Sequence, residues 1–242
     1  MSLVAAAVCP HPPLLVPQVG SGGSIEVRTP AIEAVRWLVS TDPQLIVVVG
    51  TGPETTSYTS SDTGSFQSFG VDLDVALGPR ACGGRAGLPL SLSVGVWLLR
   101  EAGWHGECQA ASVSDAATAD AAAGVGVDVG RLAEQVAILC MGDGSARRSE
   151  RAPGWLDERA APFDAAVSRA LSAADTPALL ALDIALARYL LVAGRAAWQA
   201  LAGAAVDAGP MGGWRARLTY DDAPFGVGYF VATWFPADSP NP

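Results

Sequence analysis

Histidine is scarce in this 242-residue chain, and one of its two copies directly follows the first apolar run. The run Val4–Val8 fits a short buried strand, and it leads into Cys9-Pro10-His11-Pro12-Pro13. Each proline fixes φ at about −65° and disfavours helical backbone at the residue before it. The backbone around His11 is therefore stiff, and we expect its imidazole at the end of a strand, where open α/β sheets place ligand-binding groups.

Polar residues also follow three other strand-like runs. These are Glu54 and Thr55 after Leu45–Val49, Asp143 and Ser145 after Val136–Met141, and Asp221 and Asp222 after Trp214–Tyr220. If the central strands are parallel, the first two of these loops emerge at the same edge as His11. One histidine with several carboxylates suits a divalent cation such as Fe(II), Mn(II) or Zn(II). The competing interpretation is structural, because every α/β protein has polar loops at its strand ends.

The elements that would position these groups alternate between strand and helix. Further strands are expected at Val71–Ala76, Glu107–Val113 and Gly226–Trp234. Helices are expected from Thr29-Pro30 to Asp42-Pro43, at Leu90–Glu101, within 116–134, at Pro162–Leu171 and at Pro177–Leu201 with a break near Asp183. This alternation predicts a single α/β domain over residues 1–242, with a central, mostly parallel or mixed sheet flanked by helices. The last two strands would add an antiparallel edge.

Composition limits the classes of partner. The chain is 50% hydrophobic and 16% charged, so it can bury a core and is not of the disordered class. A net charge of −9 argues against nucleic acid and against anionic membrane surfaces. No apolar run approaches the roughly 18 residues that span a bilayer. We expect a cytoplasmic protein with free thiols, and the Ala-rich segment Ala181–Ala205 is compatible with a homo-oligomer interface.

The order of these features resembles the class III extradiol ring-cleavage dioxygenase superfamily, the LigB-like fold that also includes Memo-type proteins. The segments that carry the resemblance are Cys9-Pro10-His11-Pro12-Pro13, Val49-Gly50-Thr51-Gly52-Pro53-Glu54-Thr55, Met141-Gly142-Asp143-Gly144-Ser145-Ala146-Arg147, Pro162-Phe163-Asp164 and the Tyr220 to Tyr229 hairpin. The resemblance covers nearly the whole chain and looks closest to a small actinobacterial branch of the superfamily.

This resemblance implies a non-haem Fe(II) site made of two histidines and one acidic residue, open to a catechol and dioxygen, with a further histidine as acid and base. His11 matches the first metal ligand, and Asp221 or Asp222 lies nearest to the position of the acidic one. Glu54-Thr55 stands where the second histidine ligand is expected, and Ala146 stands where the acid/base histidine is expected.

Two functions follow from these replacements. The first is a divergent enzyme that binds Fe(II) or another divalent metal through His11, Glu54 and Asp222. The second is a pseudoenzyme that needs no metal and keeps a pocket for a small aromatic or other small ligand, or for a protein partner. This pocket would be lined by Glu54, Thr55, Asp143, Ser145 and Ala146. Thr55 cannot replace an imidazole as a strong ligand and Ala146 cannot move a proton, so ordinary extradiol cleavage is not expected. The other histidine, His105, would join the site only if its turn faced the same edge.

Overall fold

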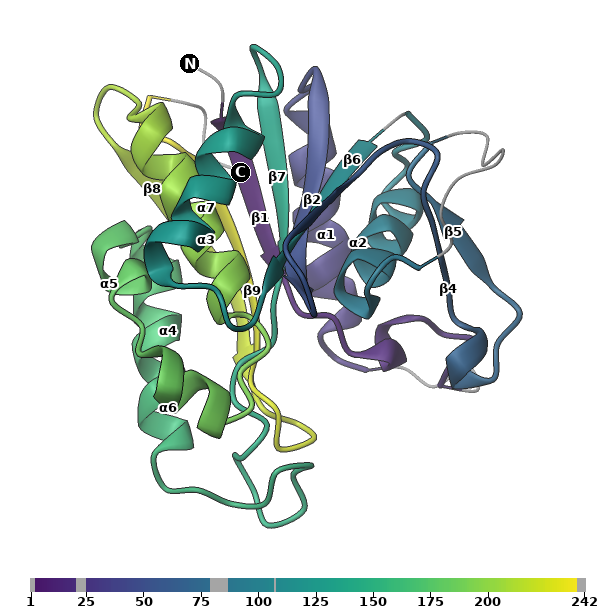
Figure 1. The fold of residues 1–242 in the computed structure, drawn as a ribbon, viewed down its shortest axis with the longest axis vertical. Helices are drawn as coiled ribbons and strands as arrows, with labels where there is room; N and C mark the ends of the chain where they lie inside the picture. The colour runs from purple at the N-terminus through teal and green to yellow at the C-terminus, as the bar shows by residue number, and fades with distance from the viewer. Residues whose placement is uncertain (1–2, 21–24, 79–86, 107, 239–242) are drawn as a thin grey trace.

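Strands and helices alternate along most of the chain, and the computed structural model describes residues 3–20, 25–78, 87–106 and 108–238 (Figure 1). The strands are β1 (Leu3–Cys9), β2 (Leu45–Gly52), β3 (Thr56–Tyr58), β4 (Thr63–Ser65), β5 (Asp74–Ala76), β6 (Cys108–Ser114), β7 (Val136–Met141), β8 (Trp214–Asp222) and β9 (Tyr229–Pro236). The helices are α1 (Arg28–Ser40), α2 (Leu90–Glu101), α3 (Ala119–Gly130), α4 (Ala160–Ala173), α5 (Thr176–Leu180), α6 (Ile184–Tyr189) and α7 (Arg195–Ala208), with short 3-10 turns at Pro13–Leu15 and Gln67–Phe69.

Seven strands form one mixed sheet in the order β3-β6-β2-β7-β1-β9-β8. The central strands β6, β2, β7 and β1 are parallel, whereas β3 and β9 pair antiparallel to β6 and β1 at either side. The expected α/β fold with a central mixed sheet is therefore confirmed, and the last two strands add an antiparallel edge as predicted. Strands β4 and β5 form a separate two-stranded sheet.

Helices cover both faces of this sheet, which explains why its central strands are apolar almost throughout. Successive side chains of a strand point to opposite faces. In β1, Ala6 and Val8 join the hydrophobic core beneath α3, α4 and α7, and Ala5, Ala7 and Cys9 join the core beneath α1 and α2. Figure 1 shows these two helical layers on either side of the strands.

The Ala-rich helix α7 lies inside the protein. Its residues from Arg195 to Ala205 are all buried, and it packs closely against α3 and α5. Small residues permit this approach: a Cβ atom at Gly126 of α3 would lie 1.7 Å from the carbonyl oxygen of Ala200, and one at Gly203 would lie 2.3 Å from that of Ala123. The alanines of α7 are thus explained by packing within the chain and do not form an exposed apolar face.

Several element boundaries differ from those predicted. Helix α1 begins at Arg28 and has no side-chain cap, so Thr29 does not cap it. The helix expected over Pro177–Leu201 is divided into α5, α6 and α7, because Asp183 caps a new helix and the chain turns again before Arg195. In that second turn Leu191 adopts a left-handed φ of 57°, which breaks the helical path.

Three cysteines, Cys9, Cys108 and Cys140, are buried free thiols, whereas Cys82 and most of the predicted loop Gly20–Ser24 lie outside the described residues. Burial raises the pKa of the thiols of Cys9 and Cys140, because the charged thiolate would lose its hydration. Within the described part of the chain, no helix is long and apolar enough to cross a membrane.

Candidate functional site

His11 lies at the carboxyl edge of the parallel strands, held by the loop that follows β7. The end of β1 is tied to that loop by the N–H of Gly142, which donates to the carbonyl oxygen of Cys9 at 2.9 Å. The backbone N–H of His11 in turn donates to Oδ1 of Asp143 at 2.7 Å. The prediction that His11 and Asp143 meet at one edge of the sheet is confirmed, since β1 and β7 are parallel neighbours.

The imidazole of His11 is buried but incompletely partnered. Its Nδ1 atom lies 3.6 Å from the same Oδ1 of Asp143, which is too long for a hydrogen bond. Nδ1 is shielded from solvent and has no hydrogen-bond partner in the structure. Burial raises the pKa of the Asp143 carboxyl, although the proximity of His11 and the bond from its backbone N–H oppose that shift.

A cavity of about 750 Å³ opens beside His11. That volume lies in the range of small-molecule sites. It is bounded by the end of β2, by the loop after β6 and by the turn between α6 and α7. The lining residues are His11, Thr51, Gly52, Pro53, Asp115, Ala187, Arg188, Leu191, Val192, Ala193, Arg195 and Ala196. The Oγ1 atom of Thr51 is, like Nδ1 of His11, buried without a hydrogen-bond partner.

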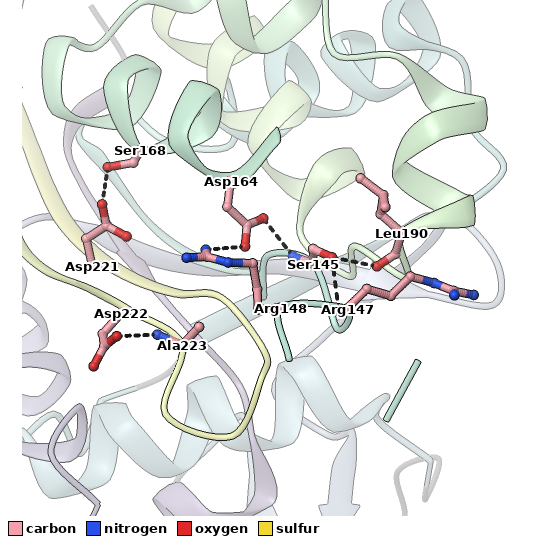
Figure 2. A network of polar contacts seen from close by, with 9 residues as sticks. All are labelled: Ser145, Arg147, Arg148, Asp164, Ser168, Leu190, Asp221, Asp222 and Ala223. Atoms are coloured by element: carbon pink, nitrogen blue, oxygen red, sulfur yellow. Dashed lines mark hydrogen bonds and ion pairs between the residues drawn. The ribbon is translucent and has the colours of Figure 1, made fainter. Parts of the chain in front are cut away.

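Ser145 and Ala146 hold the loop after β7 in place and do not line this cavity. Ser145 is fully buried; its N–H donates to Asp164 at 2.8 Å and its hydroxyl donates to the carbonyl oxygen of Leu190 at 3.0 Å (Figure 2). The N–H of Ala146 donates to the same carbonyl oxygen at 3.1 Å. These bonds connect the loop to α4 and to the end of α6.

Asp164 is the centre of that structural network. It is 1% exposed and forms an ion pair with Arg148 at 2.9 Å (Figure 2). Burial raises the pKa of its carboxyl, while Ser145 and Arg148 oppose the shift. The two glycines beside it leave room for the carboxylate, because a Cβ at Gly228 or Gly144 would lie 2.3 Å or 2.8 Å from one of its oxygens.

Glu54 and Thr55 are exposed and do not line the His11 cavity. The carbonyl oxygen of Glu54 accepts from the Ser112 hydroxyl at 2.7 Å, and Oγ1 of Thr55 accepts from the N–H of Ser114 at 3.1 Å. Thr55 lines a separate cavity of about 210 Å³ next to α3. Both residues thus fix the β2–β3 connection to β6, and neither is placed beside His11.

The two aspartates at the end of β8 also have local roles. Asp221 accepts from the hydroxyl of Ser168 on α4, and Asp222 accepts from the N–H of Ala223 at 2.7 Å (Figure 2). Two strands, β9 and β1, separate β8 from β7 in the sheet. Neither aspartate is among the residues that line the His11 cavity.

The expected Fe(II) site can be tested against these positions. An iron site of this type needs two histidines and one carboxylate around the metal. His11 and Asp143 are adjacent, but among the described residues no group of three or more histidine, cysteine or acidic side chains is arranged to hold a metal ion. His105 precedes β6, at the opposite edge of the sheet, and is exposed there. The described donors therefore do not fit the iron triad.

The two arginines at the cavity were not predicted from the sequence. Arg188 and Arg195 both line it, from the end of α6 and the start of α7. The predicted helix, unbroken from Asp183 to Leu201, would have given these arginines no shared place at the sheet edge. The one available signal is the Val192-Ala193-Gly194 segment before Arg195, because glycine is common where a helix is interrupted.

Comparison with known proteins identifies the architecture. The chain is similar to the crystal structure of the uncharacterized protein JW3007 from Escherichia coli K12, with a TM-score of 0.51 and 13% sequence identity over 96% of this chain and 99% of that one. At that identity the likeness shows a shared fold alone. No protein-family model matches the sequence, and no curated protein is significantly similar to it.

Proposed function

We propose that this protein is a divergent LigB-like protein that binds a small ligand in the cavity beside His11 and does not cleave catechols. The observation that carries the proposal is the position of His11, which follows the first strand and lines a cavity of about 750 Å³ at the carboxyl edge of the sheet. The order of strand-end loops supports the superfamily, and the cavity supports a ligand of small-molecule size.

The replaced histidines support binding over oxygen chemistry. Thr55 and Ala146, which stand where the resemblance expects histidines, hold loops together by backbone-directed hydrogen bonds. Glu54 and Asp222, the other metal ligands expected from the sequence, do not line the cavity. A protein with this arrangement keeps the site's position in the fold and loses the ligands that oxygen activation requires.

A metal-dependent enzyme is the second candidate, and one observation favours it. His11 lines the cavity and lies beside Asp143, which does not line it, and Nδ1 of His11 lacks a partner. A histidine and a carboxylate are two ligands that a divalent cation accepts, with the remaining positions left to water or substrate.

Metal analysis and ligand screening separate the two candidates. The protein would be purified anaerobically with Fe(II), its metal content measured by mass spectrometry, and its reaction with catechols followed through the yellow ring-opened product. In parallel, a library of small aromatic fragments would be screened by ligand-observed NMR. We expect fragment binding that His11→Ala weakens and that His105→Ala, the matched change at the opposite edge, leaves intact. Stoichiometric iron with product formation, both lost in His11→Ala, would refute the binding-only function.

A further inference from the structure

One end of the His11 cavity carries two guanidinium groups without a carboxylate at ion-pair distance among the described residues. Arg195 is 2% exposed, and its guanidinium donates to neutral oxygens only: the carbonyls of Asp115 and Ala117 and the side-chain amide of Gln199. Arg188 is exposed to solvent at the same cavity. Buried charges in proteins are normally paired, so a buried arginine that lines a cavity and has no carboxylate partner is unusual.

The charges around Arg195 leave this end of the cavity positive. Burial lowers the pKa of its guanidinium, the carboxylate of Asp115 opposes that shift, and the positive charge of Arg188 adds to it. Arginine nevertheless stays protonated in proteins. Asp115 is exposed at the rim, where water screens its charge more than the charge of the buried Arg195.

The first turn of α7 adds a second positive feature. This 14-residue helix begins at Arg195, and its N-cap residue, Gly194, has no side chain to bond the first N–H groups. The first backbone bond of the helix runs from the N–H of Trp198 to the carbonyl oxygen of Gly194. Arg195 and Ala196, whose N–H groups precede that bond, line the cavity. Free N–H groups and the helix dipole together favour an anion.

The rest of the cavity is partly apolar. Its wall at the turn between α6 and α7 consists of Ala187, Leu191, Val192 and Ala193. The cavity is also lined by His11 and Thr51, whose Nδ1 and Oγ1 atoms are buried without hydrogen-bond partners. A matching ligand therefore has an anionic group at one end and an apolar body, with polar substituents that reach His11 or Thr51.

We infer that the cavity binds a small organic anion, with its carboxylate or similar oxyanion held by Arg188, Arg195 and the first turn of α7, and its apolar body against the α6–α7 turn. This inference rests on the proposed function, since it names the ligand class of the same cavity. Arg188 supplies the charge that meets the incoming ligand, and Arg195 is a buried anchor that also fixes the loop after β6.

Paired probes of equal shape test the role of charge. Benzoate and benzamide differ in charge but hardly in size, and their binding would be measured by isothermal titration calorimetry at low and high salt. We expect benzoate to bind at least about tenfold more tightly than benzamide, because hydrogen bonds between charged groups are stronger than those between neutral ones. Arg188→Gln should reduce that preference. Arg36→Gln, an exposed arginine on α1, is the matched control and should leave it unchanged.

Phosphate probes identify the head group and the need for an apolar body. Phenyl phosphate that binds at least as well as benzoate, with the same dependence on Arg188, would support the inference with a phosphate as the anionic group. Inorganic phosphate that binds as tightly as benzoate would overturn it, because the apolar wall would then contribute nothing.

The remaining outcomes distinguish the inference from the proposed function. Equal binding of benzamide and benzoate, unaffected by Arg188→Gln, would overturn the anion inference and leave small-ligand binding in place. So would binding of neutral fragments only. If none of these probes and no fragment binds, both the inference and the proposed function are wrong.

Discussion

Replacing Gly126 by alanine should destabilise the protein, whereas the same change at Gly124, two residues earlier in α3, should stabilise it. Both glycines lie within one helix, where alanine is favoured over glycine by about 1 kcal/mol. They differ in their surroundings. Gly124 is exposed, and an added Cβ would meet nothing within 4 Å. Gly126 is buried, and its Cβ would lie 1.7 Å from the carbonyl oxygen of Ala200 and 2.6 Å from the carbonyl carbon.

The magnitude follows from that overlap. The van der Waals contact distance between heavy atoms is about 3.5 Å, so α3 and α7 would have to separate by roughly 1.8 Å. The atoms that the new Cβ would meet belong to the backbone and cannot rotate aside. Overpacking of this kind costs about 1–3 kcal/mol or more, which exceeds the propensity gain. We expect Gly124→Ala to gain about 0.5–1 kcal/mol and Gly126→Ala to lie at least about 2 kcal/mol below it.

Equilibrium urea unfolding, followed by circular dichroism and tryptophan fluorescence, measures the difference. The m value should stay constant if both variants keep the native fold. In a chain of this length, 2 kcal/mol corresponds to a shift in Tm of about 4–8 °C. Since the first turn of α7 lines the cavity, a displacement of α7 by Gly126→Ala should weaken ligand binding as well. Equal stability of the two variants would refute the close packing of α3 on α7.

Three other changes test the site's surroundings. Asp164→Asn should lower the free energy of unfolding by about 1.5–3 kcal/mol in urea titrations, because it leaves Arg148 without its charged partner. The control is Asp207→Asn, which breaks an exposed ion pair and should change the free energy of unfolding far less. Equal losses in the two variants would contradict the structural role of Asp164. The Tm of Asp143→Asn should rise relative to wild type as the pH rises above 3.8. Burial raises the pKa of the Asp143 carboxyl, so above this pH the unfolded wild type releases a proton that the folded wild type retains, and the wild type loses stability. A pH-independent difference would argue against this. In a Cys82→Ser background, a thiol reagent should label the native protein slowly and the urea-unfolded protein fully, and rapid native labelling would contradict the burial of Cys9, Cys108 and Cys140.

The central strands could be predicted closely because each leaves a local pattern, whereas the short strands β3 and β4 were not predicted. The runs Leu45–Val49 and Val136–Met141 are apolar throughout, and both are central strands covered on two faces. Helix α2 could also be predicted from its local pattern, and its predicted bounds match the structure. For the helix over Pro177–Leu201, the predicted break near Asp183 is confirmed, but the second break before Arg195 was missed. That turn depends on contacts with the loop after β7, since the carbonyl oxygen of Leu190 accepts bonds from the Ser145 hydroxyl and the N–H of Ala146.

The candidate site could be predicted only in part. That His11 and Asp143 meet follows from two parallel neighbouring strands, and the sequence indicated both strands and both loops. The positions of Ser145 and Glu54 could not be predicted, because a polar residue after a strand can face either the cavity or the loop's own backbone. In the structure the Ser145 hydroxyl donates to the backbone carbonyl oxygen of Leu190, whereas the Glu54 side chain is exposed and its backbone carbonyl oxygen accepts from the Ser112 hydroxyl.

The sequence by itself determined the order of elements, the apolar strands and the stiff proline turn that presents His11, because these depend on residues close together in the chain. Only the tertiary structure decided which residues line the cavity together with His11. Arg188 and Arg195 reach the cavity because α6 ends, the chain turns and α7 begins at the sheet edge. That turn is set by packing between segments far apart in sequence, such as α7 against α3, and a local pattern does not record such contacts.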